Sequence, residues 1–401
     1  MKIELAATIL FWASLAAIPY VYFGYPLLLS IGALGRRVAL IRGNALPSIS
    51  VIVPAHNEES TIEEKLTALI AADYPRELVE ILVGSDGSSD RTEDIVQRFR
   101  HEGVGLISFP RQQGKSAMQN GLVAAASGEI LVFTDADSAV PPGAFRHLVE
   151  NFADPRVGLV TGHAEYTNAG ETSVAENESV YLRYDTWLRR QESERGLLAM
   201  ASGSLFAIRR SLWKPLDPAL GDDFVLPLSI ARAGFRNVID RRVTARTRLA
   251  QDRLGAMLRM KIRIVSKDFR ALLVHREMLN PFRHGATAVG LWSHKLLRWL
   301  VPHFLLALFA SSVTLIDLSF FRVTVWLQLL FYGAATVGLL RSGRSRWWFS
   351  VPASFCLVNL AALFGIACCL AGRTSGKWQP VRADRTSLAP ASMADPFREP
   401  K

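Results

Sequence analysis

Short runs of β-branched and other hydrophobic residues alternate with helical patterns between residues 48 and 250. This alternation is typical of parallel strands joined by helical crossovers. The predicted strands are Ser50–Val53, Glu80–Val83, Val104–Ser108, Ile130–Thr134, Gly158–Gly162 and Gly203–Ile208. The predicted helices between them include Thr61–Ala71, Asp90–Arg100 and Lys115–Ala126. The pattern therefore predicts an α/β domain with a mostly parallel sheet and helices on both faces.

Long apolar segments flank this region. The segment from Leu5 to Leu34 contains no charged residue, and it exceeds the roughly 20 residues that span a bilayer core. A cleaved signal peptide is the alternative, but its apolar stretch is usually only about 7–15 residues long. Three further apolar segments lie near the C-terminus, at Trp299–Leu318, Val323–Leu340 and Phe349–Ala371.

The expected organisation follows from these segments. It comprises an N-terminal transmembrane anchor at 1–35, the α/β domain at 48–250, amphipathic interfacial helices at 251–297, C-terminal transmembrane helices at 298–372 and a polar, basic tail at 373–401. The C-terminal helices are expected to number about three.

Basic residues predict the orientation in a cell inner membrane. Arg36, Arg37 and Arg42 follow the anchor, and the positive-inside rule then places the α/β domain in the cytoplasm. Arginines at 341, 344 and 346 place the loop between the last two apolar segments on the same side. Three full crossings would leave the basic tail outside, so either the last segment is re-entrant or the tail departs from the rule.

The charge distribution also predicts the partners. The formal net charge is +10, but the basic residues cluster beside membrane segments, which favours membrane lipids and phosphate over nucleic acid. From Met257 to Leu273, apolar and cationic residues mix at helical spacing, as in a helix lying in the membrane interface, with an ordinary surface helix as the alternative. The three cysteines all lie in the final apolar segment, so a disulfide framework is not expected.

Two carboxylates follow the apolar run Ile130–Thr134. Asp135 and Asp137 are two residues apart, so in an extended segment both can face one ion while Ala136 packs behind them. Hard oxygen ligands favour Mg²⁺ or Mn²⁺, usually shared with a phosphate.

Other polar residues follow predicted strands, where open parallel sheets bind ligands. Ala55 and Glu58 lie in the sequence PAHNE after the first strand, and Asp86 lies in GSDGSSD after the second. Such loops before helices suit a nucleotide, although Asn57 and Asp90 could serve only as helix caps.

Lys115 lies in Gly-Lys-Ser, which is not a phosphate-binding P-loop because Phe109 stands where that motif requires glycine. It could help to hold a donor nucleotide, or be a solvated residue in a first helical turn. Further along, Asp222 and Asp223 open a helix. One of these acids could cap the helix and the other could act as a general base, but their spacing does not distinguish them.

These motifs occur together in a recognisable order. The set PAHNE, SDGSSD, QGKSAMQNG, TDADS, ASGSLFAIRR and GDDFVLP resembles the membrane-bound family-2 inverting glycosyltransferases of GT-A fold, relatives of cellulose, hyaluronan and poly-N-acetylglucosamine synthases. The resemblance covers roughly residues 48 to 265. It implies nucleotide contacts by Ala55, Glu58 and Asp86, a metal on the donor diphosphate held by Asp135 and Asp137, and Asp223 as the base that deprotonates the acceptor hydroxyl.

One motif of the processive members is missing. Where they carry Q-x-x-R-W on an interfacial helix, this chain has Met260-Lys261-Ile262-Arg263-Ile264. Cations remain, and Arg263, with its neighbours Arg259 and Lys261, could meet the diphosphate. The missing tryptophan argues against processive polymerisation. Residues 182–190, with Tyr184, Trp187 and Arg189, fall where the family has acceptor-facing helices, and their aromatic residues could equally be core.

The resemblance implies metal-dependent, inverting transfer of a sugar from a nucleotide sugar, expected to be a UDP-sugar, with Mn²⁺ or Mg²⁺ as cofactor. The expected acceptor is a polysaccharide or lipid-linked molecule at the cytoplasmic face, in cell-surface or extracellular polysaccharide synthesis. A catalytically silent scaffold of a polysaccharide export complex is the alternative. A sugar-phosphate nucleotidyltransferase is less favoured, because its glycine-rich strand-end signature is absent.

Overall fold

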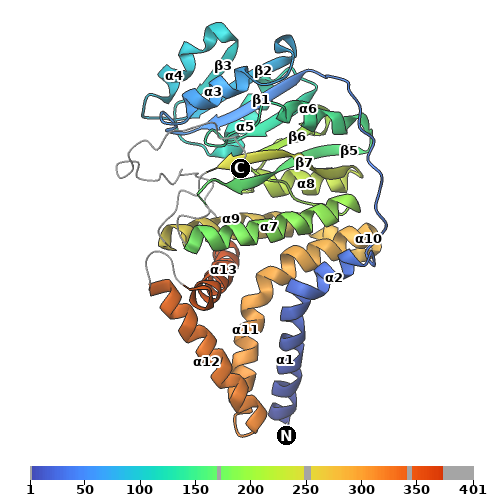
Figure 1. Ribbon diagram of the computed structural model, residues 1–401, viewed down its shortest axis with the longest axis vertical. Coiled ribbons are helices and arrows are strands. Elements are labelled where there is room, and N and C mark those ends of the chain that lie inside the picture. The colour runs from blue at the N-terminus through green and yellow to red at the C-terminus, as the bar shows by residue number, and fades with distance from the viewer. Residues whose placement is uncertain (1, 169–172, 248–253, 341–345, 374–401) are drawn as a thin grey trace. The chain divides into compact units, whose positions relative to one another are not determined.

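The computed structural model describes residues 2–168, 173–247, 254–340 and 346–373 (Figure 1). The chain forms two compact units. The first contains Met1–Arg37, Ala169–Leu197 and Asp252–Thr374, and the second contains Val38–Asn168 and Leu198–Gln251. Residues 169–197, inside the range expected for the α/β domain, therefore belong with the apolar helices of the first unit.

A seven-stranded sheet forms the centre of the second unit, in the order β3-β2-β1-β4-β6-β5-β7. The strands are β1 (Ile49–Ala55), β2 (Val79–Asp86), β3 (Val104–Phe109), β4 (Ile130–Thr134), β5 (Val157–Tyr166), β6 (Leu205–Arg209) and β7 (Arg236–Thr247). Strand β1 pairs in parallel with β2 and β4, β2 pairs in parallel with β3, and β5 pairs in parallel with β7. Strand β6 runs antiparallel to both of its neighbours, β4 and β5. The fold is thus a mostly parallel, mixed sheet, and the expectation of parallel pairing is corrected at β6.

Helices flank this sheet because their apolar faces need a partner. They are α3 (Ile62–Ile70), α4 (Thr92–Arg98), α5 (Lys115–Ala125), α6 (Ala144–Val149) and α8 (Asp222–Arg232). Short 3₁₀ segments cover Arg76–Leu78, Arg100–Glu102, Glu150–Ala153 and Arg210–Leu212. Strand β1 is buried along its whole length, as expected for a central strand covered on both faces.

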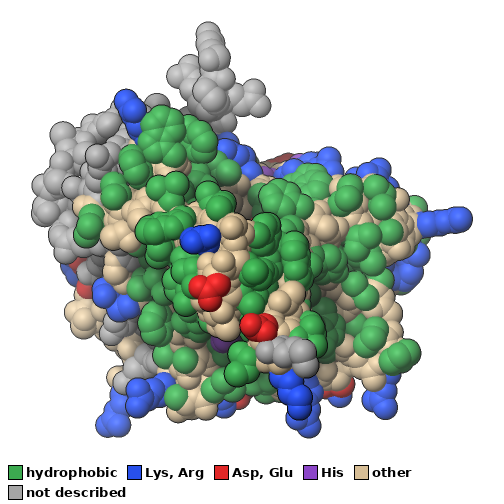
Figure 2. All heavy atoms as spheres, turned by 90° about the horizontal axis from the view of Figure 1, so that it is seen from below, with side chains coloured by type: hydrophobic (Ala, Val, Ile, Leu, Met, Phe, Trp, Pro, Cys, Tyr) green, Lys and Arg blue, Asp and Glu red, His purple; other side chains and the backbone are tan. Residues whose placement is uncertain are grey.

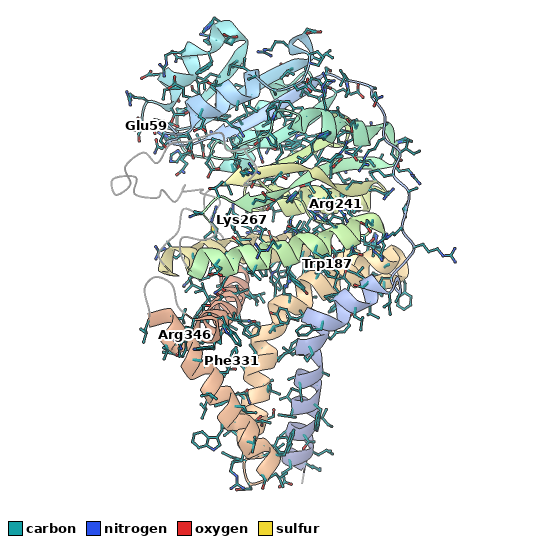
Figure 3. All side chains as sticks on the ribbon, in the orientation of Figure 1. Glu59, Trp187, Arg241, Lys267, Phe331 and Arg346 are labelled. Atoms are coloured by element: carbon teal, nitrogen blue, oxygen red, sulfur yellow. The ribbon has the colours of Figure 1, made fainter. Side chains whose placement is uncertain are left out.

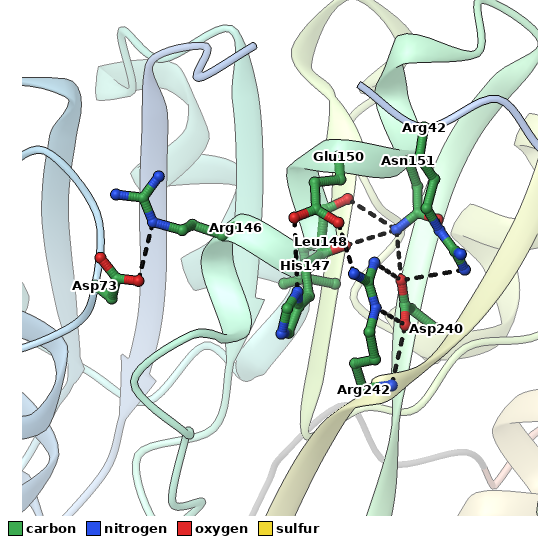
Figure 4. A network of polar contacts seen from close by, with 9 residues as sticks. All are labelled: Arg42, Asp73, Arg146, His147, Leu148, Glu150, Asn151, Asp240 and Arg242. Carbon is green, nitrogen blue, oxygen red and sulfur yellow. Dashed lines mark hydrogen bonds and ion pairs between the residues drawn. The ribbon is translucent and has the colours of Figure 1, made fainter. Parts of the chain in front are cut away.

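The buried carboxylate of Asp240 ties the segment before β1 to the edge strand β7 (Figure 4). Asp240 of β7 accepts hydrogen bonds from Arg242 at 3.1 and 2.8 Å and from Asn151 at 2.9 Å, and Arg42 lies 3.8 Å from it. Burial alone would raise the pKa of Asp240, but the hydrogen bonds from Arg242 and Asn151 lower it below its usual value. The charged form is therefore the one that this part of the fold stabilises.

The first unit consists of helices. They are α1 (Lys2–Pro19), α2 (Tyr25–Ser30), α7 (Ser173–Glu194), α9 (Leu254–Val274), α10 (Pro281–Gly290), α11 (Leu297–Thr314), α12 (Ser319–Leu340) and α13 (Trp347–Leu370). A 3₁₀ segment covers Arg276–Leu279, and π-helical segments at Tyr20–Gly24 and Leu291–Leu296 join α1 to α2 and α10 to α11.

Four helical stretches of the described residues are long and apolar enough to cross a membrane. They are Lys2–Ser30, Pro281–Thr314, Ser319–Leu340 and Trp347–Leu370. Figure 2, which views the molecule from below, shows hydrophobic side chains over most of the near face. Exposed examples include Trp12 on α1, Leu306 on α11 and Trp326 on α12. Such side chains are expected where helices meet lipid.

A buried charged cluster joins α7 to the helix that contains α11. The ring of His294 is 1% exposed and lies 2.8 Å from Glu192 through Nδ1 and 3.1 Å from Asp185 through Nε2. Arg298 and Arg189 approach the same Asp185 carboxylate at 2.9 and 2.6 Å. An unpaired charge buried in an apolar helical unit raises the free energy of the folded state. Removing any one member of this cluster is therefore expected to destabilise the unit.

Candidate functional site

The acid pair lies directly after β4, at the carboxyl edge of the sheet. Ala136 is 2% exposed and packs inward, whereas the side chain of Asp135 is 25% exposed and Asp137 is exposed. Although Asp137 reaches solvent, the protein around its carboxylate and the negative charge of Asp135 raise its pKa. A cation between the two carboxylates would relieve that repulsion.

Lys115 joins the acid pair to the helix that carries the second pair of acids. Its Nζ atom lies 2.9 Å from Asp135 and 3.3 Å from Asp222. Burial alone would lower the pKa of Lys115, but the two carboxylates outweigh it and raise the pKa. The lysine is therefore charged, and it is not the solvated first-turn residue that the sequence allowed.

The two acids at the start of α8 have different surroundings. Asp222 is 6% exposed and accepts a hydrogen bond from Gln119 at 2.7 Å, in addition to its ion pair with Lys115. It is not the N-cap, because that position is occupied by Gly221. Asp223 is half-buried and lies beside Gly203. A Cβ atom added to Gly203 would lie 3.5 Å from a carboxylate oxygen of Asp223.

One face of α5 holds the loop that leads to these acids. Ser116 donates a hydrogen bond to the carbonyl of Leu220 at 3.1 Å, and Asn120 exchanges hydrogen bonds of 2.9 and 2.8 Å with the backbone of Leu216. With Gln119, these residues stand at helical spacings of three and four. Sequence reasoning missed the role of this polar face, although its spacing in QGKSAMQNG was a usable signal.

The candidate nucleotide residues lie at the ends of neighbouring strands. Ala55 ends β1, is fully buried and pairs with Ser85 of β2. Glu58 is 6% exposed, and its carboxylate accepts a hydrogen bond from the hydroxyl of Thr61 at 2.7 Å. Its backbone N–H donates to Thr92 Oγ1 at 2.7 Å. These contacts fix the loop between β1 and α3 beside the start of α4.

The possible capping residues also connect these two loops. Asp90 accepts a hydrogen bond from the N–H of Thr92, the first residue of α4, at 3.1 Å. Asn57 has a positive φ of 55° and accepts a hydrogen bond from the N–H of Ser89 at 2.7 Å. Asn57 thus bridges two strand-end loops.

Asp86 ends β2 and holds the loop before α5. Its two carboxylate oxygens accept hydrogen bonds from the backbone N–H groups of Gln113 at 2.7 Å and Gly114 at 2.9 Å, and the residue is fully buried. Gly114 has a φ of 97°, a conformation that favours glycine. Asp86 therefore positions the backbone that presents Lys115.

Lys65 was not among the expected site residues. It lies on α3, is 4% exposed, and donates hydrogen bonds of 2.7 Å to Thr134 Oγ1 and to the carbonyl of Ser138. These acceptors flank Asp135 and Asp137 in the sequence. The signal was a lysine on the apolar face of the helix formed by Ile62, Leu66 and Leu69.

The carboxylates of Asp135 and Asp137 suit a divalent cation for which the protein supplies only part of the coordination shell. Among the described residues, no three His, Cys, Asp or Glu side chains gather into a metal-binding group. Asp135 and Asp137 supply hard oxygen donors, and Asp137 faces solvent. Mg²⁺ and Mn²⁺ suit such a site, because Mg²⁺ in particular keeps several waters and shares phosphate oxygens.

The remaining sequence candidates lie in the first unit. Arg263 is on α9, and its neighbour Lys261 pairs with Glu178 of α7 at 2.8 Å. Tyr184 donates a hydrogen bond to the carbonyl of Tyr22 at 2.9 Å, whereas Trp187 is 39% exposed. Tyr184 thus has a structural contact within this unit, and a donor contact by Arg263 remains a prediction.

Comparisons with known proteins show which sequences this chain is similar to. Residues 50–216 match the family described as Glycosyl transferase family 2. The probable glycosyltransferase YdaM of Bacillus subtilis (strain 168) is 32% identical over 201 residues, which are 47% of this chain and 48% of that protein. A poly-beta-1,6-N-acetyl-D-glucosamine synthase of Staphylococcus epidermidis is 24% identical over 247 residues, 59% of each protein. The chain spans about half the length of the first curated relatives that it matches.

Solved structures support the fold. The mannosyltransferase PcManGT from Pyrobaculum calidifontis, in complex with GDP-Man and Mn²⁺, matches with a TM-score of 0.67 and 22% identity, covering 91% of this chain and 99% of that one. The GT-A type fold expected from the sequence motifs is therefore confirmed.

Proposed function

We propose that this chain is an inverting glycosyltransferase that uses a nucleotide sugar, with a UDP-sugar as the expected donor. The match of residues 50–216 to Glycosyl transferase family 2 supports this proposal. The acceptor would be a polysaccharide or lipid-linked molecule at the cytoplasmic face of the cell inner membrane. Two relatives support these acceptor classes by name: the poly-beta-1,6-N-acetyl-D-glucosamine synthase makes a polysaccharide, and a beta-monoglucosyldiacylglycerol synthase of Trichormus variabilis, 29% identical over 170 residues, makes a glycolipid.

The observation that carries the proposal is the link from Asp135 through Lys115 to Asp222, beside the half-buried Asp223. Asp135 and Asp137 would hold Mn²⁺ or Mg²⁺, whose charge offsets that of the departing diphosphate. The ammonium of Lys115 would add a second positive charge on the donor side. Ala55, Glu58 and Asp86 would form the strand-end nucleotide site, and Arg263 would be a further diphosphate contact.

Asp223 would act on the acceptor. Its carboxylate would take the proton from the acceptor hydroxyl as that oxygen attacks the anomeric carbon, while the bond to the diphosphate breaks. Its neighbour Asp222 is buried in an ion pair with Lys115, which leaves Asp223 as the acid suited to this step. One base and no carboxylate nucleophile are needed for a single displacement, so the anomeric configuration would invert.

The test uses membranes containing the full chain, labelled nucleotide sugars and added Mn²⁺. Asp137→Asn is expected to weaken donor binding. Asp223→Asn is expected to keep donor binding but to lower turnover by at least about 100-fold, because only the acceptor step needs the base. Asp94→Asn, at an exposed acid of α4, is the matched control. Wild-type turnover in both site variants would refute the proposal, and an absence of metal-dependent donor binding by the wild type would favour the silent scaffold.

A further inference from the structure

The helix α13 is apolar and long enough to span a bilayer, yet polar contacts meet its first turns. Asn177 of α7 donates hydrogen bonds to the carbonyl of Ser350 at 3.0 Å and to Ser354 Oγ at 2.9 Å. Charged residues occur along the whole of α7, as is typical of a helix at a membrane surface rather than inside the hydrocarbon. The first turns of α13 therefore lie beside a helix that is rich in charged residues.

The other end of α13 lies against α9, which also carries many charges. A Cβ atom added to Gly365 would come within 2.7 Å of Val265 Cβ and 3.1 Å of the Ile262 carbonyl oxygen, so the two helices touch closely at this glycine. Charged residues of α9 near this contact include Lys261, Arg263, Lys267 and Arg270.

The two charged helices α7 and α9 are joined to each other. Lys261 of α9 pairs with Glu178 of α7 at 2.8 Å, one residue after the Asn177 that contacts α13. A helix that crosses a bilayer has its ends at opposite interfaces, about 30 Å apart. The early and late turns of α13 instead meet two helices that contact one another. In Figure 1, α1 and α11 run lengthwise down the picture, whereas α13 is seen close to end-on.

We propose that α13 does not cross the membrane but lies within the leaflet next to α7 and α9. The exposed face of α13 then contacts the acyl chains of that leaflet. The polypeptide crosses the bilayer three times, at Lys2–Ser30, Pro281–Thr314 and Ser319–Leu340. The exposed face of its second half is apolar, with Leu360, Phe364 and Leu370 at 39%, 48% and 71% exposure.

Residues at the ends of α13 suit this placement. At its start the guanidinium of Arg346 lies 5.3 Å from the ring centre of Trp348, and Trp347 is 70% exposed; Figure 3 labels Arg346 beside the start of α13. Trp and Arg are typical anchors of the membrane interface. Arg373 follows the end of the helix. If both ends of α13 lie on the cytoplasmic side, Arg346 before the helix and Arg373 after it both satisfy the positive-inside rule.

The test is labelling with a membrane-impermeant maleimide in a background where Cys356, Cys368 and Cys369 are replaced by alanine. Single cysteines are introduced as Asp317→Cys between α11 and α12, Arg346→Cys before α13, and Arg373→Cys after it. All three sites are exposed. Labelling is compared between intact cells and inverted membrane vesicles. The expected result is that Arg346→Cys and Arg373→Cys label from one side and Asp317→Cys from the other.

Labelling of Arg373→Cys from the same side as Asp317→Cys would overturn the proposal, because α13 would then cross. A second measurement avoids the cysteine substitutions: green fluorescent protein or alkaline phosphatase is fused after Lys401 of the otherwise unchanged chain. Fluorescence without phosphatase activity is expected, and the opposite pattern overturns the inference. Neither readout involves sugar transfer, so either result leaves the proposed function untouched.

Discussion

The ammonium of Lys115 lies 2.9 Å from the carboxylate of Asp135, the first acid after β4. The same ammonium lies 3.3 Å from Asp222, at the start of α8. A single positive charge thus connects the two acidic pairs of the candidate site, which are far apart in the sequence.

Replacing Lys115 by methionine should destabilise the second unit and weaken donor binding. Asp222 would lose its charged partner while still buried, and breaking such a pair costs about 3–5 kcal/mol when both partners are fully buried. Because the lysine side chain is 18% exposed, we expect about 2–3 kcal/mol. Thermal unfolding of the purified protein measures the loss. The double variant Lys115→Met with Asp222→Asn should regain part of the stability, and equal melting of the single and double variants would argue against the pairing.

Lys65 should make stability depend on pH in the alkaline range. Burial lowers the pKa of Lys65 to about 7, although the carboxylates of Asp135 and Asp137 oppose this shift. Between pH 7 and the ordinary lysine pKa of about 10.4, the unfolded chain binds a proton that the native chain does not. The free energy of unfolding should therefore rise with pH in this window, by at most about 1.4 kcal/mol per pH unit.

The Lys65→Met variant should lose this rise. Unfolding midpoints measured from pH 7 to 10 test it, with Lys214→Met at an exposed lysine as the control. If Lys65→Met retains the slope of the wild type, the lowered pKa of the buried Lys65 amine is not the source of that slope.

Asp86→Asn should loosen the loop that presents Lys115. Asparagine offers one acceptor oxygen where the two carboxylate oxygens of Asp86 now receive the N–H groups of Gln113 and Gly114. One buried N–H group would lose its acceptor, at a cost of about 1–3 kcal/mol. We expect a lower unfolding temperature together with weaker nucleotide binding, measured by titration of the purified protein. Unchanged values for both quantities would contradict the assignment.

His294→Leu should destabilise the first unit strongly. Both ring nitrogens face carboxylates, those of Glu192 and Asp185, and leucine would leave these buried acids without their shared partner. The expected cost is about 3–5 kcal/mol, seen as earlier thermal unfolding in detergent. His303→Leu replaces an exposed histidine of α11 and should have little effect. Similar losses in the two variants would show that the cluster contributes no special stability.

The buried strands were predictable because a short hydrophobic run between turn residues, in a chain that alternates strands and helices, usually forms a buried strand. Strand β7 was missed since Arg241 and Arg242 lie exposed in its middle and the register shifts between β5 and β7. The direction of β6 was also missed, because a strand has the same pattern of buried residues whichever way it runs. The grouping of residues 169–197 with the first unit depends on contacts distant in sequence.

For the candidate site, the hydrophobic run Ile130–Thr134 correctly predicted that Asp135 and Asp137 follow a buried strand. The extended backbone expected between the two acids is wrong, because β4 ends at Thr134 and a turn covers Ala136 and Asp137. The different surroundings of Asp222 and Asp223 could not be predicted, because both acids begin one helix. Only the tertiary contacts with Lys115 and Gln119 distinguish them. Lys65 was hidden for a similar reason, since its partners lie about 70 residues away along the chain.

The polar face of α5 sets a mechanical constraint on the domain. Ser116, Gln119 and Asn120 fasten the segment from Leu216 to Asp222 at several points, while Lys115 at the same helix start holds Asp135. The proposed leaving-group side and the proposed acceptor side are therefore both fastened to one helix. If these roles are correct, the distance between the two sides is set by contacts within the protein, and a substitution on the polar face of α5 should affect both.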